Sequence, residues 1–200
     1  MEGIYRNELN TMQKAFSRFA AALQDYISGN AEIRAKYNDI SQNVALREQR
    51  AALNAVRSDA ANRISSAAEK LKEHIITVWM PNKALYDRDV VAMLTDGLLS
   101  YSGKALENMA SSRYADNPTM LQVLRGFVDK NNLIGELSHE SPLLYASKEK
   151  KLDAAESLKS ELLGIIGNTS EAPGHDKSVM YLAENFETVF KNKLDIIGKI

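Results

Sequence analysis

The feature that most constrains this chain is a stretch of 49 residues, from Ala31 to Trp79, that contains neither glycine nor proline. It is rich in Ala, Arg, Glu, Gln, Lys and Leu, which are strong helix formers. We expect one long helix here. At about 1.5 Å per residue such a helix reaches roughly 70 Å, beyond the diameter of a compact domain of this length. The helix must therefore protrude or be held by another chain.

Apolar residues recur along this stretch at spacings of three and four, which places them on one narrow face of a helix. The stripe is interrupted between Val44 and Leu53, where the seam positions fall on Arg47 and on Gln49 or Arg50. We interpret this interruption as a polar segment that fixes the register of self-association. The residues predicted to form the self-association seam are Ile33, Tyr37, Ile40, Val44, Leu53, Val56, Ile64, Leu71, Ile75 and Val78.

The partner of this seam is left open by the sequence. Several seam positions hold alanine, such as Ala60 and Ala67, which permits close helix approach but buries little apolar surface. We therefore expect an antiparallel partner within the chain or a bundle of several chains, rather than a free two-stranded coiled coil. A first helix over residues 8–28, ended by Gly29-Asn30, would supply a partner along the first half. An ordinary long bundle helix inside one domain is the alternative.

Capping signals divide the remainder of the chain. Pro81 ends the long helix because proline disfavours helical geometry in the residue before it. Asp87 is a candidate N-cap for a helix that reaches Leu99, with Gly103 as an interruption. Asp116 or Asn117 followed by Pro118 predicts another start, and Ser141-Pro142 repeats this pattern. A final amphipathic helix is expected from about Lys177.

These patterns predict an all-α fold. The chain has only four prolines and ten glycines and few alternating β-branched segments. We expect an elongated helical bundle with one helix of about 45–50 residues and a smaller C-terminal helical part. The predicted division is an N-terminal hairpin over residues 1–81 and a C-terminal helical bundle over residues 82–200.

Composition excludes several classes of protein. The formal net charge is −1 and there is no cysteine, so disulfides and thiol chemistry are absent. No apolar run is long enough to cross a membrane, and residues 1–6 lack the apolar segment of a secretory signal. These features predict a cytoplasmic protein with no membrane partner.

The residues that could carry chemistry are scattered. His74, His139 and His175 lie far apart and lack neighbouring ligands at metal-binding spacing. Asp87 and Asp89 are explained by helix capping and by the helix dipole. No phosphate-binding loop or nucleophile elbow is present. We therefore predict no catalytic residue, no metal, no cofactor and no small-molecule substrate, and hence a protein that is not an enzyme.

Nucleic-acid binding would depend on the bases of the long stretch. Eight bases face six acids there, an excess of about two, whereas a surface that follows phosphates usually needs more. We therefore do not expect nucleic-acid binding. The alternative hypothesis for the function is a helical adaptor or regulator that binds nucleic acid or a partner protein through this basic face. The bases are Arg34, Lys36, Arg47, Arg50, Arg57, Arg63, Lys70 and Lys72.

The long helix, an interruption and a helix opened by Asp116-Asn117-Pro118-Thr119-Met120-Leu121 form a pattern over residues 31–130. This pattern resembles small helical proteins encoded near the capsid genes of tailed phages and prophages. The resemblance implies a head-assembly or scaffold-like component that oligomerises without catalysis, within the cytoplasm or an assembled particle. It assigns no functional residue. The leading prediction is a structural or assembly protein that forms a homo-oligomer.

Overall fold

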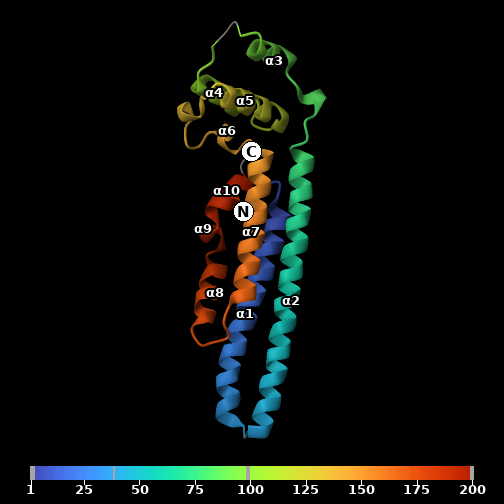
Figure 1. Ribbon diagram of the computed structural model, residues 1–200, viewed down its shortest axis with the longest axis vertical. Coiled ribbons are helices and arrows are strands. Elements are labelled where there is room, and N and C mark those ends of the chain that lie inside the picture. The colour runs from blue at the N-terminus through green and yellow to red at the C-terminus, as the bar shows by residue number, and fades with distance from the viewer. Residues whose placement is uncertain (1–2, 38, 98–99, 199–200) are drawn as a thin grey trace. The chain divides into compact units, whose positions relative to one another are not determined.

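The computed structural model describes residues 3–37, 39–97 and 100–198, and every regular element in these ranges is a helix (Figure 1). The prediction of an all-α fold is confirmed. The elements are α1 (Arg6–Lys36), α2 (Asp39–Val78), η1 (Lys83–Leu85), α3 (Arg88–Thr95), α4 (Gly103–Arg113), α5 (Pro118–Lys130), η2 (Ile134–Glu136), α6 (Pro142–Tyr145), α7 (Lys148–Asn168), α8 (His175–Glu184), α9 (Phe186–Val189) and α10 (Lys191–Gly198).

The chain forms two compact units. Unit 1 comprises Met1–Leu71 and Ala155–Leu194, and unit 2 comprises Lys72–Ala154 and Asp195–Ile200. The boundaries therefore fall inside α2, α7 and α10. The predicted division at residue 81, into an N-terminal hairpin and a C-terminal helical bundle, stays a prediction.

The turn between the first two helices lies further along the chain than the sequence indicated. Helix α1 continues through Gly29 and Asn30 to Lys36, and the backbone becomes extended at Tyr37, with φ −114° and ψ 151°. Helix α2 therefore has 40 residues. The prediction that Gly29-Asn30 ends the helix was wrong, because an interior glycine costs a helix only about 1 kcal/mol.

Gly29 has a packing role instead. A Cβ atom added at Gly29 would lie 2.5 Å from Nε2 of Gln49, which belongs to α2. Only a residue without a side chain fits beside Gln49 in its present position. The glycine thus leaves room for the side chain of Gln49 beside α1.

Unit 1 is built around the apolar face of α1. Its largest buried side chains include Phe16 and Phe19, and α1 packs along α8. The ring of Phe16 lies 6.4 Å from that of Phe186 on α9. On the other side, Arg18 pairs with Asp59 of α2 at 3.1 Å. Helix α1 is therefore held between α2 and the C-terminal helices of its own unit.

Local capping shapes unit 2. The side chain of Asn117 accepts a hydrogen bond from the Met120 amide at 3.0 Å, and Pro118 occupies the first turn of α5, as the sequence predicted. Helix α3 ends at Thr95, earlier than predicted, because Gly97 adopts φ +66°. The predicted continuation through Leu98 and Leu99 lies outside the described residues. Gly103 begins α4 rather than interrupting a helix.

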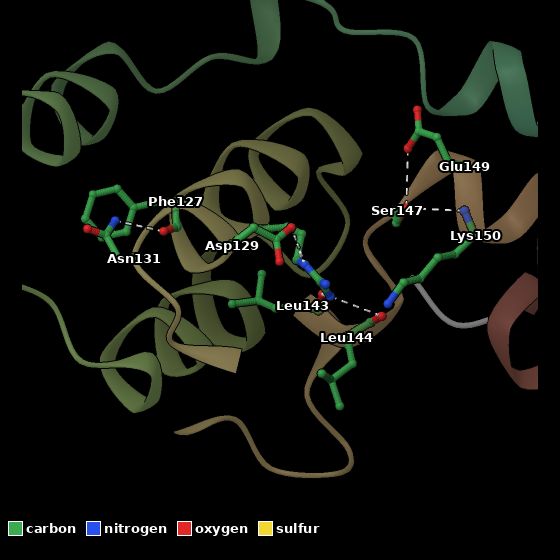
Figure 2. A network of polar contacts seen from close by, with 9 residues as sticks. Phe127, Asp129, Asn131, Leu143, Leu144, Ser147, Glu149 and Lys150 are labelled. Atoms are coloured by element: carbon green, nitrogen blue, oxygen red, sulfur yellow. Dashed lines mark hydrogen bonds and ion pairs between the residues drawn. The ribbon is translucent and has the colours of Figure 1, made fainter. Parts of the chain in front are cut away.

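A buried arginine organises the contact between α5 and α6. Arg125 is 8% exposed, donates to the Leu143 carbonyl at 2.8 Å and pairs with Asp129 at 2.8 Å. Figure 2 shows Asp129 and Leu143 converging on this point. Farther along the chain, Ser147 accepts a hydrogen bond from the Lys150 amide at 3.3 Å and caps α7. The single helix predicted from Pro142 therefore forms as two, α6 and α7.

Candidate association surface

The predicted self-association seam divides into buried and exposed parts. Among its members, Ile64, Leu71 and Ile75 are fully buried, and Leu53 is 2% exposed. Ile33, on α1, is also buried, while Val56 and Val78 are half-buried. By contrast, Tyr37, Ile40 and Val44 are 53%, 81% and 56% exposed. The spacing rule thus identified the residues that pack along α2 from Leu53 onward.

From Leu53 to Leu71 the seam is buried within unit 1. The Arg57 guanidinium lies 5.8 Å from the centre of the Phe19 ring of α1. Lys159 of α7 pairs with Glu69 at 3.0 Å, so α7 also runs beside this part of α2. The sequence did not decide whether the partner of this seam comes from the same chain or from another. Along this segment the same chain supplies it, through α1 and α7.

The polar interruption of the seam faces a small gap between α1 and α2. The gap has a volume of about 210 Å³, and its lining includes Tyr26, Gln49 and Leu53. Oε1 of Gln49 is buried there without a hydrogen-bond partner in the described part of the chain. This stretch of the seam is loosely packed, because Gln49 stands where an apolar residue would continue the stripe.

Glu171 joins the loop after α7 to the helical hairpin. Its carboxylate accepts a hydrogen bond from the Tyr26 hydroxyl at 3.0 Å and pairs with Arg50 at 3.4 Å and Arg57 at 3.5 Å. The carboxylate side chain is only 21% exposed, so these contacts are less screened than those of a surface pair. Sequence reasoning missed Glu171 because nothing in a loop of this composition identifies its distant partners.

These ion pairs alter the basic face considered for nucleic acid. Arg50 and Arg57 share the carboxylate of Glu171, and Arg63 pairs with Asp59 at 2.9 Å. Three of the predicted contact arginines are therefore partly neutralised by acids of their own unit. The positive potential available to a phosphate backbone is lower than the sequence count indicated.

The segment beyond these contacts is defined here as the hairpin tip, residues 31–48. It contains the end of α1, the beginning of α2 and the three exposed seam residues. Figure 1 shows the paired helix ends extending past the loop that precedes α8. Apart from Ile33, every residue described at the tip is exposed or half-buried. The tip is the part of the predicted seam that the chain itself leaves uncovered.

Outside the seam, Asp87 and Tyr114 are ionisable groups with a structural role. Asp87 accepts hydrogen bonds from the Val90 amide at 3.2 Å and the Tyr114 hydroxyl at 2.6 Å, and it pairs with Arg113 at 2.6 Å. The Tyr114 hydrogen bond and the capping amide lower the pKa of Asp87. Burial and the bond to Asp87 raise the pKa of Tyr114 to about 12. The prediction that Asp87 caps a helix is confirmed.

Lys151 is a buried cation that the sequence analysis did not single out. It is fully buried and donates from Nζ to the carbonyls of Ile196 at 2.7 Å and Ile197 at 3.1 Å. Nζ also lies 5.1 Å from the centre of the Trp79 ring. Lys151 thus satisfies carbonyl groups in the last turn of α10, where a cation is favoured. The available signal was its spacing, because Lys151 lies four residues before Ala155 on the apolar face of α7.

No metal-binding group emerges from the described residues: none of their His, Asp and Glu side chains gather in threes. Within the same ranges, none of the helices is both long and apolar enough to cross a membrane. Comparison of the chain with protein-family models, with known proteins and with solved structures found no match.

Proposed function

We propose that this protein is a non-enzymatic helical assembly protein that self-associates through the hairpin tip. One observation carries the proposal: the exposed members of the apolar seam, Tyr37, Ile40 and Val44, are confined to this tip. Ile40 and Val44 lie four residues apart on α2 and therefore share one face of the helix. Burial of such a face against another apolar surface is favourable, because it removes apolar side chains from water.

The charges of the tip favour a second copy of the chain as the partner. A two-fold contact brings the same patch of both copies together, so a patch of one sign would repel itself. The tip instead carries three acids and three bases and is neutral overall. These residues are Glu32, Arg34, Lys36, Asp39, Arg47 and Glu48, all of them exposed. Each base can approach an acid of the other copy.

An assembly role of this kind agrees with the resemblance to phage head-assembly proteins, which also act by oligomerising. In this proposal the buried part of α2 serves as a rigid support, and the tip provides the contact. The polar segment at Gln49 and Arg50 separates the exposed part of the seam from the part buried within the chain, and it limits the contact to the tip. Such a device restricts the alignments that two copies can adopt.

Substitution at the tip tests this proposal. Ile40→Asp and Val44→Asp place charges on an exposed face, so each monomer should keep its helical circular dichroism. We expect both variants to sediment as monomers at protein concentrations where the wild type sediments as an oligomer. Tyr181 is 61% exposed on α8, and Tyr181→Asp is the matched control that should leave oligomerisation unchanged. Oligomers of Ile40→Asp and Val44→Asp as stable as those of the wild type would refute the proposal.

The second candidate function is an adaptor that binds nucleic acid or a protein through the basic face of residues 31–79, which the structure divides between the end of α1 and α2. Arg34 on α1 and Arg47 and Lys70 on α2 are exposed, form no ion pair with other described residues and would be its free cations. Three free cations are few for a site that follows phosphates, since each neutralised phosphate adds to the salt dependence of affinity. This candidate predicts DNA or RNA binding at low salt that is lost when Arg50, Arg57 and Arg63 are replaced by glutamine.

A further inference from the structure

A second feature of the molecule lies in unit 2, where a cavity of about 650 Å³ opens beside α3. Its volume falls within the range of small-molecule sites, about 300–1,000 Å³. Residues from η1, the turn that follows it, α3 and α5 form its lining. They are Lys83, Tyr86, Arg88, Val91, Ala92, Thr95 and Val123.

The walls of this cavity are held by hydrogen bonds to neighbouring elements. The Asn82 amide donates to Oγ1 of Thr119 at 3.1 Å, and Nδ2 of Asn117 donates to the Leu85 carbonyl at 2.9 Å. Asp87 is fixed by the Tyr114 hydroxyl and by Arg113, each at 2.6 Å. The segment that carries Lys83 and Arg88 is therefore anchored to α5 and α4 on both sides. A pre-formed wall loses little conformational entropy when it binds a ligand.

The charge of the lining has one sign. Lys83 and Arg88 are the ionisable cations of the lining, and neither forms an ion pair or a side-chain hydrogen bond with the residues that the structure describes. No carboxylate belongs to the lining. Asp87, next to Arg88 in the sequence, is already occupied by Arg113 and Tyr114. Two cations in a lining without a carboxylate favour an anion in this space.

The remaining wall is apolar. Val91 and Ala92 on α3 and Val123 on α5 present aliphatic surface, and Tyr86 adds an aromatic ring. Because Arg88, Val91 and Ala92 lie within one turn of α3, the guanidinium and the aliphatic wall share one face of that helix. A ligand that satisfies both parts of the lining needs an anionic head and an apolar body.

We infer that this cavity binds a small amphiphilic anion, with a carboxylate or phosphate head held by Arg88 and Lys83 and an apolar body against Val91, Ala92 and Val123. The planar guanidinium of Arg88 matches either head group through two parallel hydrogen bonds. This site is separate from the hairpin tip, which belongs to unit 1. Its occupation does not depend on self-association.

Calorimetric titration with four probes tests the assignment. Decanoate and decyl phosphate each combine head and body, whereas inorganic phosphate has only the head and decanol only the body. We expect saturable binding of decanoate or decyl phosphate, and at least tenfold weaker binding of phosphate and decanol. The stronger of the two amphiphiles identifies the head group. Equal binding of decanol would overturn the inference, because the cations would then have no role.

Substitutions locate the binding within the cavity. Arg88→Gln and Lys83→Gln should each weaken binding of the amphiphile at least tenfold, and both side chains are exposed, so folding is preserved. Lys130→Gln removes an exposed cation outside the lining and is the matched control. Unchanged affinity in Arg88→Gln and Lys83→Gln would overturn the inference. The assignment to a small molecule would also be overturned if an acidic peptide displaced the amphiphile and bound more tightly than the amphiphile does.

Discussion

At the scale of single residues, the sequence predicted side chains that act on their own neighbours. Asp87 and Asn117 each cap a helix by accepting a hydrogen bond from the backbone amide three residues ahead. The capping residue and the amide that it binds are therefore close together in the sequence. Lys151 could not be predicted in the same way. Its partners at Ile196 and Ile197 lie more than 40 residues away, and only the folded chain brings them together.

The burial of Lys151 gives a prediction about pH. Burial lowers the pKa of Lys151 from 10.5 to about 8. Between these values the unfolded chain holds a proton that the folded chain lacks, so the free energy of unfolding should rise with pH across this window. Below pH 8 and above pH 10.5 this contribution should be constant. The measurement is urea unfolding at pH 8, 9 and 10.

The substitution Lys151→Met should remove much of this rise, because methionine has no proton to lose. Lys150 is exposed, and Lys150→Met is the control that should retain the rise seen in the wild type. The methionine at 151 also leaves two carbonyls of α10 without their donor, which should cost about 1–3 kcal/mol. A rise that persists unchanged in Lys151→Met would show that the proton is bound elsewhere.

At the scale of helices, periodicity predicted which face of α2 is buried but not what covers it. Leu53, Ile64 and Leu71 occupy seam positions because the spacing of apolar residues fixes one face of a helix. The same spacing is compatible with a partner from the same chain or another chain, so it could not identify α1 and α7. Charged substitutions at Ile64 or Leu71 therefore test folding, since both residues are fully buried.

The helix boundary at Gly29 was mispredicted because a glycine signal has two meanings. Glycine ends helices, and it also permits close helix contacts. The sequence around Gly29 does not distinguish these meanings, because the contact with Gln49 spans the turn between α1 and α2. The all-α class did not depend on this boundary, and it was predicted correctly.

The Gly29 contact gives a prediction at this scale. Alanine stabilises a helix interior by about 1 kcal/mol relative to glycine. In the wild type, part of this gain should be lost because the new Cβ displaces the amide of Gln49. Gly29→Ala should therefore stabilise more in a Gln49→Ala background than alone, which a double-mutant cycle of urea unfolding measures. Equal effects in both backgrounds would show that the two side chains do not interact.

At the scale of the whole molecule, the chain covers most of its long apolar seam by itself and leaves one end open. The seam residues Leu53, Ile64 and Leu71 are buried in unit 1, and the open end is the hairpin tip. This division explains how one helix can serve both as internal support and as a contact surface. The sequence left open whether the seam is covered by the same chain or by another, because burial by α1 and α7 depends on contacts between distant segments.

The mass in solution, measured by light scattering after size-exclusion chromatography over a range of protein and salt concentrations, tests the central claim most directly. One chain has a mass of 22.2 kDa. If the chain self-associates through the tip, the measured mass should be a defined multiple of this value. On dilution the oligomer should keep this mass until it dissociates to monomers in a single step. Because the contact has an apolar centre with charges around it, salt should weaken it only modestly. A mass of 22.2 kDa at every concentration would contradict the account.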